Sequence, residues 1–448
     1  MAKIVPNVVV EEAKGKNASN FNQISPCRET INIWGIVPSF DAVPRVRVIG
    51  PLEHLAAAGL ATFQLFRPQE VEFVLYDNVQ LPDIVILCRV VEPPIMVRLV
   101  KQFQAAGVAV IYDIDDQLLA LPPTHPDYIV HQNPILRSTL IQLLRAVDRI
   151  TVTTAALHDS LIQYNPMISV LPNCIDLNLF KKPVQSQGDI PIVIGYAGTR
   201  THAGDFVAVV PAIKQLLDEF GEQIVFRFIG FIPEELKGIN RVEFINGHPD
   251  YRMFAEILRR SGFHVGLAPL VDNSFNRCKS DMKYLEYSAL GIPGIYSSVH
   301  PYLDTIRDGV TGLIVQPHTP EAWYRAIAWM ITHPLERRQM GEAAYQEVVR
   351  TRSLQANIHS WYTVYTAAIA QRRDSAVSVQ TNHVAQRRLR TELLFLPIDA
   401  GLGRRFLFNF KTLRLLALRY QQFRSVIDIF RNQGPTELLQ RVRSRLRW

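Results

Sequence analysis

A regular alternation of short apolar runs with helical stretches is the feature that most limits the possible folds of this chain. Residues 83–88 (DIVILC) and 108–112 (VAVIY) are continuous apolar runs, and residues 94–106 between them carry a helical pattern. Continuous runs of this kind are typical of strands buried on both faces. Strands that alternate with helices of about 10–15 residues favour a parallel sheet. We therefore predict an α/β fold with a doubly wound sheet.

The alternation stops near residues 173–187, which are polar and contain proline, and then restarts. In the second series, 192–196 and 224–229 are predicted strands and 205–220 is a predicted helix. A chain of 448 residues exceeds one ordinary domain. We predict five parts, which are a flexible lead-in (1–27), a first domain (28–183), a second domain (188–350), a helix that crosses back to the first domain (351–372) and a basic amphipathic tail (373–448).

Charge is distributed unevenly between the body of the chain and its tail. Residues 371–448 contain 16 Lys and Arg against 5 Asp and Glu, whereas the first 370 residues contain 32 and 36. The body therefore lacks the positive charge that nucleic-acid binding requires. In the tail, Leu413, Leu416, Tyr420 and Phe423 recur at helical spacing between arginines. Such a helix suits an anionic membrane surface. A linker, or a helix packed on its own chain or on a neighbouring domain, is the alternative.

Cysteine usage and hydropathy indicate the compartment. The four cysteines (Cys27, Cys88, Cys174 and Cys278) are far apart and form no CxxC pair. This pattern fits a reducing compartment and disfavours a zinc site or a disulfide framework. The N-terminus lacks a signal-peptide core, and no apolar run approaches the roughly 18 residues of a membrane span. We expect a cytoplasmic protein whose tail is a candidate for peripheral association with the inner face of the cell membrane.

Residues 274–298 (SFNRCKSDMKYLEYSALGIPGIYSS) contain the strongest candidate for a binding site. On one continuous helix, Lys279, Lys283 and Glu286 fall at i, i+4 and i+7 and share a face, with Ser280 as a plausible N-cap. Two ammonium groups near a helix N-terminus suit a diphosphate. The Glu286 carboxylate is placed to accept hydrogen bonds from ribose hydroxyls. The alternative reading is an ordinary helical salt pair between Lys283 and Glu286.

Motifs of several other enzyme classes are absent. The chain has no Walker phosphate loop and no GxSxG nucleophile elbow. Residues 195–198 (GYAG) lack the third glycine of the dinucleotide-binding fingerprint. A nicotinamide enzyme and an α/β hydrolase are therefore disfavoured.

Four segments together resemble the group 1 glycosyltransferases, also called glycosyltransferase family 4. They are VIYDIDD with the following LPPTHP (110–126), LPNCID with Phe180 (171–180), IGYAGT with Thr201, His202 and Asp205 (194–205), and FN, KS and KYLEY through GIP (275–293). The likeness covers about residues 30–365. It implies the GT-B architecture, in which two Rossmann-like domains face a cleft.

The resemblance implies a transferase of the EC 2.4 type, for hexosyl or related groups. It would move a sugar from a nucleotide-diphosphate donor to a glycan, lipid or polyisoprenoid-linked acceptor, in cell-surface polysaccharide or glycoconjugate synthesis. The family usually retains the anomeric configuration and needs no metal and no cofactor beyond the nucleotide sugar. Two alternatives remain open, which are a non-catalytic protein that binds a nucleotide or glycan and a nucleotide-sugar epimerase.

The resemblance also assigns donor-side residues. These are Gly198, Thr199, Arg200, His202, Asn276, Lys279, Ser280, Lys283 and Glu286, with Lys279 also a catalytic candidate. The family carries two glutamates with seven residues between them, and Glu286 matches the second. Cys278 stands where the first would be. Because a thiol cannot replace a carboxylate, Asn276 or Lys279 is expected to contact the donor sugar.

The acceptor side is expected in the first domain, beyond the carboxyl ends of its strands. Ser39, Arg89, Asp116 and His125 are the candidates, and Asp115 is the candidate base for the acceptor hydroxyl. The DIDD run at 113–116 resembles metal-binding DxD motifs of other glycosyltransferase folds. We expect it to lie away from the diphosphate, with an acceptor-side or structural role and no metal.

Overall fold

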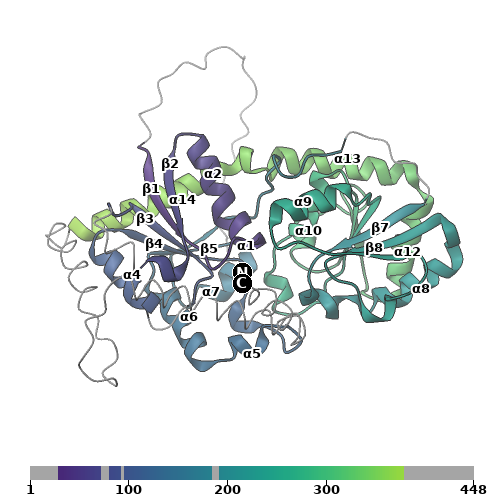
Figure 1. Cartoon of the computed structure of the whole chain (residues 1–448), viewed down its shortest axis with the longest axis horizontal. Helices are drawn as coiled ribbons and strands as arrows, with labels where there is room; N and C mark the ends of the chain where they lie inside the picture. Colours follow the sequence, from purple (N-terminus) through teal and green to yellow (C-terminus); the bar gives the residue numbers. More distant parts are fainter. Residues whose placement is uncertain (1–28, 72–79, 92–94, 184–190, 378–448) are drawn as a thin grey trace, which may run out of the picture. The chain divides into compact units, whose positions relative to one another are not determined.

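The computed structural model describes residues 29–71, 80–91, 95–183 and 191–377. These residues form two six-stranded sheets in series, and every strand pairing in both sheets is parallel (Figure 1). The predicted α/β fold with two doubly wound units is confirmed. The lead-in and the amphipathic part of the tail lie outside the described residues. No helix among the described residues is both long and apolar enough to cross a membrane.

The first sheet has the strand order β2-β1-β3-β4-β5-β6. Its strands are β1 (Ile31–Ile36), β2 (Ala61–Phe66), β3 (Ile84–Cys88), β4 (Ala109–Ile114), β5 (Arg149–Val152) and β6 (Ile168–Val170). The helices between them are α1 (Ala42–Pro44), the π-helix η1 (Arg45–Ile49), α2 (Gly50–Ala57), α4 (Ile95–Ala105), η2 (Leu118–Ala120), α5 (Tyr128–His131), α6 (Pro134–Ala146) and α7 (Ala155–Leu161).

Each face of the first sheet is covered by helices. On one face, Ile33 and Ile86 pack with Leu52 of α2 and with Trp361 and Tyr365 of α14 (Leu354–Val377). Helix α14 is therefore part of the core of the first sheet, although it follows the second sheet in the sequence. The opposite face is covered by α4 and α6.

The second sheet has the strand order β12-β11-β10-β7-β8-β9. Its strands are β7 (Ile192–Ala197), β8 (Ile224–Ile229), β9 (Val242–Ile245), β10 (Val265–Ala268), β11 (Gly294–Ser297) and β12 (Leu313–Val315). Its helices are η3 (Arg200–Phe206), α8 (Val209–Phe220), η4 (Gly221–Gln223), η5 (Glu234–Leu236), α9 (Tyr251–Arg260), η6 (Asn276–Cys278), α10 (Met282–Ala289), α11 (Tyr302–Thr305), α12 (Pro320–Thr332) and α13 (Pro334–Thr351).

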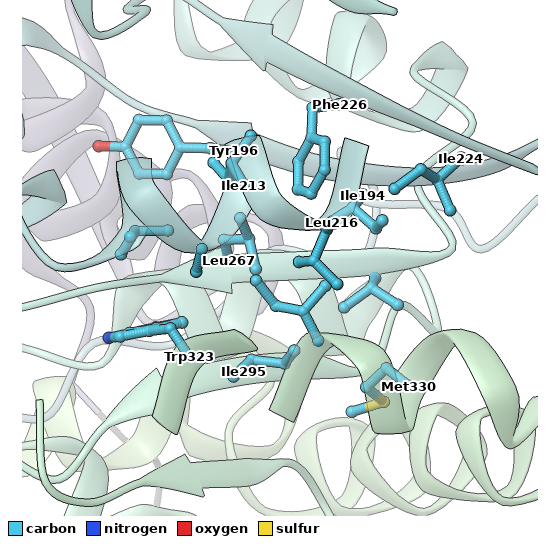
Figure 2. Close-up of a cluster of buried hydrophobic side chains, with 14 of the residues drawn as sticks. Ile194, Tyr196, Ile213, Leu216, Ile224, Phe226, Leu267, Ile295, Trp323 and Met330 are labelled. Atoms are coloured by element: carbon cyan, nitrogen blue, oxygen red, sulfur yellow. The ribbon is translucent and has the colours of Figure 1, made fainter. Parts of the chain in front are cut away.

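The two faces of the second sheet follow from the alternation of side chains along each strand. On one face, Ile194 and Phe226 meet Ile213 of α8 and Trp323 of α12, and Figure 2 shows these side chains in one cluster. On the other face, Val193 and Ala197 are part of a cluster with side chains from α9, α10 and α13. Both faces are buried, which explains the near-continuous apolar runs of the strands.

In each sheet the order of the strands reverses at one point. These points lie between β1 and β3 in the first sheet and between β7 and β10 in the second. Open α/β sheets bind ligands outside the carboxyl ends of the strands at such positions. The segments that follow β1, β3, β7 and β10 are therefore the places to look for a site.

Two helices of the structure begin with irregular turns. The helix expected from residue 205 is preceded by the 3-10 turns of η3, and regular α-helix begins at Val209. The helical segment after β1 is a π-helix from Arg45 to Ile49, and regular helix α2 has Pro51 in its first turn. Proline has no N–H to donate and suits a first turn, so the regular helix starts there.

Candidate functional site

A polar pocket of about 330 Å³ lies at the carboxyl ends of strands from both sheets. A volume of this size is at the lower end of the range for small-ligand sites. Ten of the residues predicted from the sequence line it, and they are Arg89, Asp115, Asp116, His125, Thr199, His202, Lys279, Ser280, Lys283 and Glu286. The pocket therefore brings together predicted donor-side and acceptor-side residues.

The N-terminus of α10 opens into this pocket, since Met282 and Lys283 line it. Asp281 occupies the N-cap position but makes no side-chain cap. Its carboxylate instead accepts hydrogen bonds from Arg352 and Thr305. The first backbone N–H groups of α10 therefore have no side-chain cap, and such groups suit an anion.

The expected N-cap role of Ser280 is wrong. Helix α10 begins after Asp281, so Ser280 lies one residue too early to cap it. The Ser280 hydroxyl accepts a hydrogen bond of 2.7 Å from Asn173 Nδ2. This bond joins the segment before α10 to the segment after β6, and it places Ser280 at the pocket wall.

Lys279, Lys283 and Glu286 do not share one helical face as predicted, because Lys279 precedes α10 in extended backbone. All three side chains nevertheless line the pocket. Lys279 Nζ lies 4.6 Å from the centre of the Phe275 ring, and Lys283 Nζ lies 3.6 Å from Glu286 Oε2. Both lysines and the start of α10 line one pocket, and ammonium groups beside an uncapped helix N-terminus suit a diphosphate.

Glu286 is a buried carboxylate with spare hydrogen-bonding capacity. Its Oε1 accepts a 3.0 Å hydrogen bond from Tyr251 Oη, and its Oε2 has no hydrogen-bond partner. Burial raises the pKa of Glu286, while Lys283 and Tyr251 oppose that shift. The Lys283 ammonium lies 3.6 Å from Oε2, so a ligand hydroxyl could add the hydrogen bond that this buried oxygen lacks.

The turn after β7 approaches the pocket through Thr199, Thr201 and His202. A Cβ on Gly198 would lie 2.3 Å from the hydroxyl of the fully buried Tyr196, so only glycine fits at this position. Gly198 donates its N–H to Ile229 O and is absent from the pocket lining. Gly198 thus shapes the turn.

Arg89, Asp115 and Asp116 form a charged cluster on the first-sheet side of the pocket. Arg89 Nη1 lies 3.3 Å from Asp115 Oδ1 and 3.8 Å from Asp116 Oδ2. Arg89 has a φ of 52°, a left-handed conformation that is uncommon for a residue with a side chain. Non-glycine residues in this conformation cluster at functional sites.

The two neighbouring aspartates have opposite pKa shifts. Burial and the nearby Asp116 raise the pKa of Asp115 to about 6, although Arg89 opposes the shift. Burial acts in the same direction on Asp116, but Lys279 and Arg89 outweigh it and lower the pKa of Asp116. Paired groups with diverging pKa values are typical of acid–base chemistry.

The DIDD run does not lie away from the expected diphosphate side, because Asp116 Oδ1 is 3.7 Å from Lys279 Nζ. Asp113, the first aspartate of the run, is separate from the pocket. It pairs with both Nε and Nη2 of the buried Arg47 and accepts a hydrogen bond from Thr151. Among the described residues, no group of three or more His, Cys, Asp and Glu is placed to hold a metal.

His125 lines the pocket and packs its ring against Phe275, with ring centres 5.5 Å apart. Its Nδ1 accepts a hydrogen bond from Asp127 N. Partial burial lowers the pKa of His125.

Several predicted residues lie outside the pocket lining. Arg200 is exposed and faces a separate hollow beside η5 and β9. Ser39 donates its hydroxyl to Asp41. Asn276 Nδ2 donates to Asp205 and to Val271 O, and Asn276 is absent from the pocket lining. Ser39 and Asn276 differ from the expectation because local hydrogen-bond partners hold their side chains.

Cys278 is also outside the pocket lining. Its thiol is next to Ser160 of α7, and its carbonyl accepts a hydrogen bond from Thr154. The position that the family fills with a glutamate is thus turned towards α7.

The sequence reading missed Arg47, Asn173 and Tyr251, which also line the pocket. Arg47 donates to Leu171 O and to Asn173 Oδ1, and Asn173 in turn donates to Ser280. Asn173 lies inside a segment that carried the resemblance, so its segment was identified but its role was not. Tyr251 had no local signal.

Comparison with known proteins confirms the resemblance to group 1 glycosyltransferases. Residues 282–347, which comprise α10 to most of α13, match the family described as "Glycosyl transferases group 1". A curated relative, the D-inositol 3-phosphate glycosyltransferase of Corynebacterium glutamicum (strain R), is 29% identical over 150 residues. The match covers 34% of this chain and 33% of the relative, so the chain spans about a third of the length of that protein.

Solved structures confirm the GT-B fold. The sucrose-phosphate synthase of Thermosynechococcus elongatus superposes with a TM-score of 0.59 at 15% identity, over 76% of this chain and 100% of that chain. A glycosyltransferase of Rickettsia africae has a TM-score of 0.53 at 15% identity, over 76% and 99%. Anabaena HepE, solved with UDP and glucose, has a TM-score of 0.52 at 13% identity, over 78% and 100%.

Proposed function

We propose that this GT-B protein is a glycosyltransferase that moves a sugar from a nucleotide-diphosphate sugar to a glycan or lipid-linked acceptor. The second sheet binds the donor, and the first sheet positions the acceptor. Transfer is metal-independent and retains the anomeric configuration, as the resemblance to group 1 enzymes implies. A role in cell-surface polysaccharide or glycoconjugate synthesis, and a hexosyl donor, are parts of the same proposal.

One observation carries this proposal, namely the uncapped N-terminus of α10 between Lys279 and Lys283. Backbone N–H groups and ammonium groups supply positive charge where a nucleoside diphosphate departs. Glu286 lies one turn further along α10, and its Oε2, which is near Lys283 but makes no hydrogen bond, is proposed to accept from a ribose hydroxyl. HepE, solved with UDP and glucose, and the E. coli trehalose-6-phosphate protein, solved with UDP-2-fluoro glucose, share this fold and bind such ligands.

On the acceptor side, Asp115 is the proposed base for the attacking hydroxyl. It lines the same pocket as Lys279, and burial raises its pKa to about 6. A base whose pKa lies near the working pH combines the ionised form with useful basicity. Arg89 contacts Asp115 and is proposed to orient it.

A second cavity of about 240 Å³ supports an acceptor with an apolar part. Arg89 lines both cavities, so the two are neighbours. Most of the second lining is apolar, and it includes Val90, Leu119, Val130, Leu136 and Leu140. An acceptor hydroxyl in the first cavity would place an attached lipid or polyisoprenoid chain here.

The sequence of the basic tail also supports a lipid-linked acceptor. The amphipathic part of this tail lies outside the described residues. We propose that it holds a cytoplasmic enzyme at the inner face of the membrane. Flotation with anionic vesicles should recover the full chain but not a chain that ends near Arg373. Equal recovery of both would remove the tail from the proposal.

The proposal is tested first by binding and then by transfer. Thermal unfolding is recorded with UDP, GDP, ADP and their common sugar conjugates. A ligand at about 100 times its Kd adds about 2.7 kcal/mol of stability. One of the three nucleotides should stabilise the protein. The sugar conjugate of that nucleotide should then be consumed with a suitable acceptor. If no nucleotide binds and no sugar is transferred or hydrolysed across a broad panel, the proposal is wrong.

A further inference from the structure

His202 and Asp205 form a polarised pair beside the pocket that the sequence reading did not connect. His202 Nδ1 lies 2.8 Å from Asp205 Oδ2. The other oxygen, Asp205 Oδ1, accepts hydrogen bonds from Val271 N at 2.8 Å and from Asn276 Nδ2 at 3.2 Å. A carboxylate only accepts hydrogen bonds, so the proton of the pair is on Nδ1 of His202.

This arrangement determines what His202 presents to the pocket. His202 lines the pocket, and about 20% of its side chain is exposed, whereas Asp205 is buried behind it. With Nδ1 bonded to Asp205, only Nε2 is left for a ligand. A neutral ring presents a lone pair at Nε2, and a protonated ring presents an N–H donor.

Several charged or titratable groups surround the pair. They are Asp205 in η3, Lys279 before α10, Lys283 in α10, Asp116 after β4, and Tyr302 and His318, which interact with Asp205. Burial lowers the pKa of His202, the hydrogen bond to Asp205 opposes this, and Lys279 and Lys283 lower it further. The ring is therefore neutral at neutral pH while the pocket is empty.

A bound diphosphate changes the balance between the neutral and the protonated form of the His202 ring. Phosphate oxygens are hydrogen-bond acceptors, so a lone pair on Nε2 would repel them. Their negative charge also offsets the two lysines and favours the protonated ring. We propose that the His202–Asp205 pair takes up one proton when a nucleoside diphosphate binds and donates a hydrogen bond from Nε2 to the phosphate. This inference rests on the proposed function, since it assumes that the pocket takes a nucleoside diphosphate.

The His202–Asp205 pair would also stabilise the nucleoside diphosphate as it departs from the sugar. In sugar transfer the bond from the sugar to the phosphate oxygen breaks, and its electron pair passes to that oxygen. An Nε2–H donor at the same phosphate stabilises the added charge, as preorganised donors do at other developing oxyanions. Asp205 acts through His202 and is a positioning residue.

Titration calorimetry tests the inference. UDP, GDP and ADP are titrated into the full chain at about pH 8, above the ordinary imidazole pKa of about 6.5. Each titration is repeated in Tris, HEPES and Bicine, whose ionisation enthalpies differ. The observed enthalpy, plotted against the buffer enthalpy, should indicate uptake of about one proton by the wild type. The affinity should fall about tenfold for each pH unit above the pKa of free His202.

Two variants assign the proton. His202→Gln should abolish the uptake and remove the pH dependence, which excludes the phosphate itself as the proton acceptor. His300→Gln is the matched control, because His300 Nδ1 also lies 2.8 Å from an aspartate, Asp304, but is about half exposed and outside the pocket. This control should behave like the wild type.

The outcomes separate the two proposals. Nucleotide binding without proton uptake overturns this inference and leaves the proposed function intact. No binding of any of the three nucleotides counts against the proposed function and against this inference with it. If His202→Gln binds too weakly for titration, NMR of the imidazole carbons decides, since the His202 ring of the wild type should become protonated only when nucleotide is present.

Discussion

Arg47 and Asp113 form a buried two-pronged ion pair, with Nε–Oδ1 and Nη2–Oδ2 distances of 3.0 and 2.8 Å. Arg47 also donates to Leu171 O and to Asn173, which holds Ser280 at the pocket. A residue of the irregular helix after β1 thus connects the core of the first sheet to the segment that precedes α10.

Removing Arg47 should therefore be costly. Arg47→Ala leaves Asp113 as an unpaired buried carboxylate, and breaking a buried pair in this way costs about 3–5 kcal/mol. Urea unfolding of wild type and variant measures the difference. Arg277→Ala is the control, since Arg277 makes the same two-pronged contact with Asp272 at the surface. The control should lose little or no stability, because an exposed ion pair contributes little. Similar losses in both variants would contradict a special role for the buried pair.

Lys279 should contribute strongly to nucleotide binding. A hydrogen bond to a charged partner contributes about 1.5–3 kcal/mol. Lys279→Ala should therefore weaken nucleoside diphosphate binding about 10- to 100-fold. Calorimetry measures the Kd, and Lys214→Ala serves as the control because Lys214 is exposed on α8 and does not line the pocket. An unchanged Kd in Lys279→Ala would place the diphosphate elsewhere.

Glu286 should reduce stability at neutral pH in the absence of ligand. Burial raises its pKa in the folded protein, so its contribution is most favourable at low pH and is lost as the pH rises through the folded pKa. Glu286→Gln should thus gain stability relative to wild type between about pH 4 and pH 7, and it should bind nucleotide more weakly. Thermal unfolding across this range is the measurement.

Glu243→Gln is the control for Glu286, since the Glu243 side chain is about half exposed on β9. It should show no such change with pH. A Glu286→Gln variant that is less stable than wild type at neutral pH, or that binds nucleotide equally well, would show that this carboxylate is structural.

Asp115 should be needed for transfer but not for nucleotide binding. Because its pKa is raised to about 6, the fraction of ionised base falls about tenfold per pH unit below that value. The kcat for transfer should fall accordingly on the acid side. Asp115→Asn should abolish transfer and keep the Kd for nucleotide. Asp272→Asn, at an exposed site, should change neither. Full activity of Asp115→Asn would exclude Asp115 as the base.

Transfer should not depend on a divalent metal. Lys279, Lys283 and the N-terminus of α10 supply positive charge at the proposed diphosphate position. The rate in excess EDTA should equal the rate in Mg²⁺ or Mn²⁺. A rate that EDTA abolishes and Mn²⁺ restores would assign the DIDD segment or a neighbouring carboxylate a metal-binding role.

The sequence by itself determined the two parallel sheets and the segments that line the site. Buried parallel strands require continuous apolar runs, and the helices between them repeat at a regular length, so both features can be read locally. The glycine at 198 and the lysines at 279 and 283 were identified because their segments carry a recognisable pattern.

Only the tertiary structure decided which side chains meet. Asp116 approaches Lys279, and Asn173 reaches Ser280, through contacts between residues more than 100 positions apart. Arg47 and Tyr251 join the site in the same way. Arg200 lies outside the pocket lining, and hydrogen bonds to Asp205 and Val271 hold the side chain of Asn276. Periodicity reports the face of one element, whereas the orientation of two elements depends on packing throughout the core.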